Sequence, residues 1–246
     1  RDGVRAASYG CIHHDGRTYS DFLAELGYRR FGPEHAAHLD PDLIANTRQR
    51  KPGWRGMLGQ VDQAESHLQN RGMAVGSIFL FWGWFDFVDA RSCVHSRPGF
   101  SSLFGYLEVD QILTVGLDDP PEYAPYHPHF ADAYPRRKNR VYVARETLSW
   151  NPNKPGWGVF SYDARLRLST KGEKRRHWTL PGCFHPDEGC VLTYNTKREN
   201  WGEPGDQTTL HVPARGQEFV CRLSPDINQW VHKIIDDTPI WSPNGG

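Results

Sequence analysis

The sequence predicts an α+β fold in which a β-rich bent sheet or barrel carries flanking helices. Helical patterns come first along the chain and one more comes last, whereas short β-like runs fill the space between, an order that argues against alternating βαβ units. Residues 79–87 form an aromatic run too short to cross a membrane, and we expect a central strand covered on both faces. A second apolar run, residues 103–115, predicts its neighbour in the bent sheet.

Capping residues and apolar spacing predict four helices. The predicted starts are Ser20, Asp40 followed by Pro41, Asp62 with Glu65 as a capping box, and Ser224 followed by Pro225. The helix from Asp62 carries one apolar stripe and should cover the two central strands. In this interpretation the side chain of Asp40 is occupied as a helix cap.

The residues between the central strands and the last helix form short runs broken by Gly, Pro and Asn, which predicts an antiparallel, loop-rich half. These runs are residues 141–144, 158–160, 166–168, 178–180, 191–194, 210–212 and 218–221. We expect one domain over residues 1–246, with a helical part to about 72, a β-rich core over about 73–222 and a final helix at about 224–236.

Composition excludes several classes of protein. Lys plus Arg and Asp plus Glu both number 29, so the chain lacks the positive field that grips a long duplex. The five cysteines form no CxxC pair, which favours a reducing compartment. No segment is a membrane span and the first residues resemble no signal peptide, so we expect a cytoplasmic protein. The common nucleotide-loop, zincin, serine-hydrolase and deaminase motifs are missing, and we predict no cofactor.

Five blocks of sequence together resemble one known family, the third of the nucleotide-modification-associated domains. They include HLDPDL at 38–43, a block at 59–68, GSIFLFWGWF at 76–85, FGYLEV at 104–109 and ARGQEFV at 214–220. The resemblance implies a role in phage and bacterial systems that process modified DNA bases, and it names no reaction. A looser likeness, to PUA-like barrels such as the ASCH and EVE groups, implies an aromatic pocket that holds a single flipped or modified base.

The candidate site combines a titratable group, polar anchors and stacking rings. His67 is the first choice, as a general base or as a reader of a base edge, and a satisfied histidine at the helix edge is the alternative. Asp42 is the candidate carboxylate for an acid/base pair. The predicted substrate-binding residues are Gln60, Ser66, Trp82, Trp84, Tyr106, Arg140, Arg215 and Gln217.

Two histidine patterns could bind metal, yet both have a structural explanation. His38 lies beside Asp40, which already caps a helix in this interpretation, and the prolines around His127 and His129 favour an ordered loop. We therefore predict no metal.

Three functions remain open: an enzyme acting on a nucleobase or nucleotide, a reader of modified bases without catalysis, and a protein-interaction domain. The expected partner in the first two is a nucleotide or a single flipped base, with DNA as a possible source and no membrane.

Overall fold

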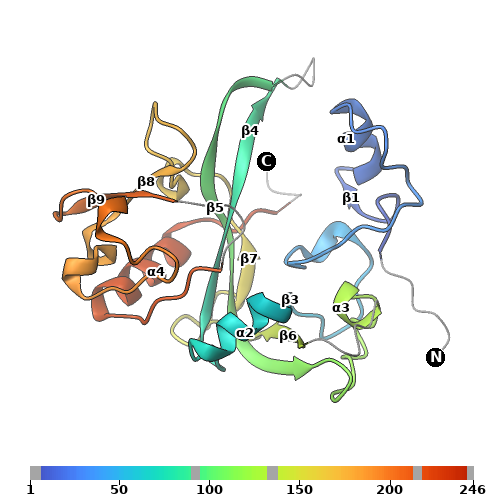
Figure 1. Ribbon diagram of the computed structural model, residues 1–246. Coiled ribbons are helices and arrows are strands. Elements are labelled where there is room, and N and C mark those ends of the chain that lie inside the picture. The colour runs from blue at the N-terminus through green and yellow to red at the C-terminus, as the bar shows by residue number, and fades with distance from the viewer. Residues whose placement is uncertain (1–6, 90–94, 132–137, 213–217, 243–246) are drawn as a thin grey trace.

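The computed structural model describes residues 7–89, 95–131, 138–212 and 218–242 (Figure 1). Its largest sheet is antiparallel, with strands in the order β3 (Met57–Val61), β6 (Asn139–Ala144), β5 (His95–Thr114) and β4 (Ile78–Val88). Strand β7 (Trp157–Val159) also pairs with β5. The fold is α+β as predicted, but among the described residues no sheet closes into a barrel.

Strands β4 and β5 form a long antiparallel pair that crosses the molecule (Figure 1). The prediction that the two apolar runs are adjacent strands is confirmed. The prediction that the aromatic run is a central strand is wrong, because β5 is the only described strand that pairs with β4. Its two-sided apolar pattern arises because Leu80 and Trp82 pack into one hydrophobic cluster while Phe79 and Phe81 pack into another.

Helix α2 (Asp62–Asn70) follows β3 directly and covers one face of the sheet. Leu68 is buried there against Leu107 and Val109 of β5, so the predicted cover by this helix is confirmed. The predicted capping box is wrong: Val61 is the N-cap, and no side chain caps the helix.

The other face of the β4–β5 pair carries the antiparallel strands β8 (His177–Pro181) and β9 (Gln207–His211) and helix α4 (Pro225–Asp237) (Figure 1). The start of α4 is confirmed, since the Ser224 side chain accepts a hydrogen bond from the Ile227 N–H. Strands β1 (His13–His14) and β2 (Arg17–Thr18) form a small separate sheet before α1 (Tyr19–Glu25). Thr18 caps α1, two residues before the predicted Ser20.

The remaining helices are short. They are α3 (Pro128–Ala131) and the 3₁₀ turns Ala45–Thr47, Ala164–Leu166, Gly182–Phe184, Pro186–Glu188 and Arg198–Asn200. Within the described residues, no helix has the length and apolar character needed to cross a membrane.

Three predicted strands are not strands: residues 166–168 begin at the end of a 3₁₀ turn, and residues 191–194 and 218–221 are loops. Leu166, Leu168 and Leu192 are buried there without a ladder of backbone hydrogen bonds, whereas Val191 and Tyr194 are exposed. The Thr193 N–H donates to the Val220 carbonyl, whereas the Val220 N–H donates to the Thr193 side chain. Burial and strand formation give similar short apolar patterns, which the sequence could not separate.

The helix predicted from Asp40 is absent, and residues 40–44 form extended and bend structure after a cis Asp40–Pro41 peptide. Asp42 forms an antiparallel bridge with Met57 through two backbone hydrogen bonds. The Asp40 side chain instead accepts a hydrogen bond from the Gly59 N–H at 2.8 Å. Asp40 is thus free of the capping role that the sequence assigned to it.

Glu65, on the buried face of α2, should give the protein a distinct pH dependence. Burial raises the pKa of Glu65 above its ordinary value of 4.5, although Tyr142 and Gln69 donate hydrogen bonds to the carboxylate. A group whose folded pKa is raised contributes stability that is complete below the unfolded pKa and is lost as the pH rises through the folded pKa. We therefore expect the free energy of unfolding to fall more steeply from pH 4.5 toward neutrality in the wild type than in Glu65→Gln. Urea unfolding of both proteins across this pH range measures the free energy of unfolding. The same pH dependence in the wild type and in Glu65→Gln would contradict a raised pKa for Glu65.

Candidate functional site

A cavity of about 1060 Å³ lies along the edge of β4 that has no described partner strand. Its walls come from β4, from α2 and the turn after it, from the loop at 218–223, and from α4. The residues of β4 that line it are Ile78, Phe79, Leu80, Phe81, Trp82, Gly83 and Trp84. Because residues from both faces of β4 contribute, the cavity wraps around the strand edge.

The two predicted stacking residues, Trp82 and Trp84, both line this cavity, but their surroundings differ. Trp82 packs edge-on against Trp178, with ring centroids 4.8 Å apart. Its ring also stacks with that of Phe219, with centroids 5.9 Å apart. Trp84 is half-buried, and the guanidinium of Arg175 lies 5.6 Å from its ring centroid. Trp82 is therefore part of the core, whereas Trp84 lies nearer the end of β4 that leads into β5.

Polar groups lie at intervals around the apolar walls. Gln60 of β3, predicted as a polar anchor, lines the cavity, as do Arg71 and Arg222. Both arginines are exposed, and neither makes an ion pair with a described residue. An edge strand also leaves alternate backbone N–H and C=O groups outside the ladder, and here that edge borders the cavity.

His67 and Ser66, also predicted for the site, are on α2 but are not among the cavity-lining residues. The His67 Nε2 atom lies 3.0 Å from the Thr193 hydroxyl, and the ring packs on Tyr194 at 4.6 Å. Burial, followed by the charge of Arg71, lowers the pKa of His67, which favours the neutral imidazole. Ser66 donates to the Asp62 carbonyl.

Two other predicted residues also lie away from the cavity lining. Tyr106 is fully buried and donates to the Pro155 carbonyl at 2.9 Å. Arg140 is opposite Gln60 in the sheet, and its guanidinium lies 3.6 Å from the Glu65 carboxylate. Arg215 and Gln217 lie outside the described residues.

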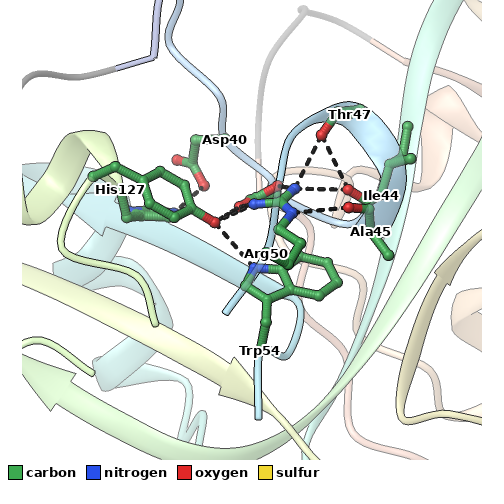
Figure 2. A network of polar contacts seen from close by, with 9 residues as sticks. Asp40, Ile44, Ala45, Thr47, Arg50, Trp54 and His127 are labelled. Atoms are coloured by element: carbon green, nitrogen blue, oxygen red, sulfur yellow. Dashed lines mark hydrogen bonds and ion pairs between the residues drawn. The ribbon is translucent and has the colours of Figure 1, made fainter. Parts of the chain in front are cut away.

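Asp42, predicted as a catalytic carboxylate, is fully buried and belongs to a polar network centred on Arg50, which Figure 2 shows. Arg50 binds it in a bidentate manner, with N–O distances of 2.6 and 2.7 Å, and the Tyr126 hydroxyl donates to it at 2.7 Å. Arg50 also donates to the Ile44 and Ala45 carbonyls. This network fixes the segment after Asp40 against the sheet.

A second cluster, which the sequence analysis did not assemble, surrounds Asp40 at the cavity wall. His38, His127 and His129 each place Nε2 within 3.3 to 3.7 Å of an Asp40 carboxylate oxygen. Burial alone would raise the pKa of Asp40, but the contacts with His127, His129 and His38 outweigh it and lower that pKa. The sequence contained both histidine patterns, but it could not show that α3 brings them to one carboxylate.

The fold and the cavity define a mixed α+β protein with an aromatic, partly polar pocket at a sheet edge. Residues 2–222 match the model of nucleotide modification associated domain 3, so the chain belongs to that family. The resemblance inferred from the five sequence blocks is confirmed. No curated protein and no solved structure matches the chain.

Proposed function

We propose that the cavity beside β4 binds a single modified nucleobase or nucleotide, as a step in recognising or processing modified DNA bases in a prokaryotic or phage DNA-modification system. The observation that carries the proposal is an aromatic cavity of about 1060 Å³ in a chain that belongs to a nucleotide-modification-associated family. Small-molecule sites are usually apolar concavities of roughly 300–1,000 Å³ with a few polar groups, so there is room for a whole nucleotide.

The chemistry of the walls suits a base better than a duplex face. Aromatic rings stack on any base, and the free edge of β4 offers backbone donors and acceptors for its polar edge. The positive and negative charges of the chain balance, so it lacks the excess of positive charge with which proteins bind many phosphates of a long duplex. A base taken out of the stack is the form of DNA that such a pocket accepts.

For an enzymatic version we propose His67 as the acid/base group, since its lowered pKa favours the neutral imidazole and Arg71, one helical turn later, lines the cavity. Asp42 is less suited to that role because Arg50 and Tyr126 already occupy its oxygens. If His67 only supports the pocket wall, the same cavity acts as a reader. Loss of turnover with retained binding in His67→Ala is the result that identifies the enzyme.

The phosphate of a bound nucleotide should be held by Arg71 and Arg222, the two exposed arginines of the cavity lining. We expect Arg71→Ala with Arg222→Ala to weaken binding of nucleoside monophosphates about 10-fold or more, and to leave binding of the matching nucleosides nearly unchanged. Calorimetric titration measures both. Arg29→Ala, which removes an exposed arginine outside the cavity lining, is the control. Equal loss for nucleoside and nucleotide would contradict the assignment.

A further inference from the structure

We propose that His38, Asp40 and His129 form a binding site for a divalent first-row transition ion, with zinc as the reference metal. This inference does not depend on nucleotide binding. The three side chains place their ligand atoms within 4.8 Å of one another. Two imidazoles and one carboxylate are a donor set that zinc and its neighbours in the series bind, and that magnesium and calcium, which prefer oxygen ligands, do not.

The spacing of the ligand atoms fits an ion. Asp40 Oδ2 lies 3.3 Å from His129 Nε2 and 3.7 Å from His38 Nε2. Ligands of a tetrahedral ion at about 2.0–2.1 Å are separated from each other by about 3.3 Å. The observed distances are close to this value, whereas the 3.7 Å separation is too long for a hydrogen bond.

Hydrogen bonding directs the Nε2 atom of His129 toward Asp40. The His129 Nδ1 atom lies 2.7 Å from Asn139 Oδ1, and the Asn139 amide nitrogen donates to the His129 carbonyl. That pair of bonds makes Oδ1 the acceptor, so Nδ1 carries a proton and Nε2 is the ring atom that faces the carboxylate. Nε2 and the Asp40 carboxylate both offer lone pairs to each other, so the contact needs a cation between them, either a proton on Nε2 or a metal ion. An outer partner that fixes the tautomer in this way is typical of metal-binding histidines.

His127 provides an independent observation. Its ring is fully buried, and within the described part of the chain neither ring nitrogen has a hydrogen-bond partner. Its Nε2 faces the other oxygen of Asp40 at 3.6 Å, the oxygen that already accepts from the Gly59 N–H. A buried, unpartnered imidazole is costly, and it points to a group that is bound at this carboxylate. We place it as an outer support of Asp40 rather than as a ligand.

The cluster is also accessible. The Asp40 and His129 side chains are 7% and 6% exposed, whereas His38 is 64% exposed. An ion held by these three would have two buried ligands and one ligand at the surface, which leaves a route in from solvent and an open coordination position. Asp40 also lines the cavity, so that position adjoins the proposed nucleotide site.

The backbone at β3 is shaped around this cluster. Gly59 has no side chain, and a Cβ there would overlap the His129 ring. The absence of a Cβ lets the histidine lie directly on the strand, where the Gly59 N–H holds Asp40. The earlier reason for predicting no metal, that Asp40 caps a helix, no longer applies because no helix begins there.

Zinc titration of tag-free, metal-stripped full-length protein tests the proposal. We expect one Zn²⁺ per chain by calorimetry and elemental analysis, a higher melting temperature with zinc, and no binding of Mg²⁺. Asp40→Asn keeps an oxygen for Gly59 but removes the anionic ligand. His38→Ala changes an exposed residue and should not affect folding. Loss of an outer partner lowers metal affinity by about 10- to 100-fold. Because these two residues are ligands, we expect each substitution to lower zinc affinity by more than that.

His13→Ala, which removes an exposed histidine outside the cluster, is the matched control and should bind zinc like the wild type. No stoichiometric zinc in the wild type would overturn the proposal, and a proton on His129 would then be the cation that balances Asp40. Zinc that binds equally well to the wild type, His38→Ala and Asp40→Asn would also overturn it and would assign the ion to other ligands such as the free cysteines.

Discussion

Replacing Asp42 by Asn is expected to lower the free energy of unfolding by about 3–5 kcal/mol, because it leaves the Arg50 guanidinium buried without its anion. The Asp42 side chain is fully buried and that of Arg50 is 9% exposed, so water screens the pair poorly. The bidentate geometry and the added Tyr126 hydrogen bond indicate a tightly coupled pair. Urea unfolding followed by tryptophan fluorescence measures the loss.

Two comparisons separate this buried pair from an ordinary salt bridge. Glu199→Gln removes one partner of the exposed Lys197–Glu199 pair, and it should change stability by no more than about 1 kcal/mol. Combining Asp42→Asn with Arg50→Met should recover part of the loss, because neither charge is then stranded. A cost for Asp42→Asn as small as that for Glu199→Gln would show that the network does not anchor this segment.

Replacing Trp84 by Leu is expected to weaken nucleotide binding by roughly 1–3 kcal/mol, about 5- to 150-fold, with little effect on folding. Trp84 lines the cavity and is half-buried, whereas Trp82 is fixed between Trp178 and Phe219. Trp84 is thus the ring better placed to stack on a base. Calorimetric titration with base-modified and unmodified nucleoside monophosphates measures the loss.

The matched control is Trp241→Leu, the same substitution at a half-buried tryptophan outside the cavity lining. It should leave nucleotide affinity unchanged. If both variants lose affinity equally, the effect is one of stability and not of stacking.

Much of the fold could be predicted because strong patterns dictate it. The two apolar runs could satisfy their backbone groups and bury their side chains only as neighbouring strands, and the cap at Ser224 fixes the start of α4. The position of β4 at an edge could not be predicted, since an edge strand covered by two hydrophobic clusters has the same composition as a central one. Strand β3 was missed because Gly59 interrupts a run of only five residues.

The candidate site was predicted in part for a similar reason. Local sequence places Trp82 and Trp84 on one strand, and the structure brings them to one cavity with Gln60. The Asp40 cluster depends on contacts between segments some 90 residues apart, which no local pattern encodes. The Asp-Pro pair was misread as a helix start because the same dipeptide also occurs in turns.

Hydrogen exchange of the β4 backbone, with and without a saturating nucleotide, tests the central claim most directly. The cavity wraps around the unpaired edge of Ile78–Trp84, so a base bound there should slow exchange of edge amides in that strand. We predict slower exchange centred on residues 78–84 and also in the cavity-lining turn after α2. The Trp84→Leu variant should not show this protection. If no nucleotide of the panel binds, or if the protection falls outside the cavity lining, the assignment of the cavity as the nucleotide site is contradicted.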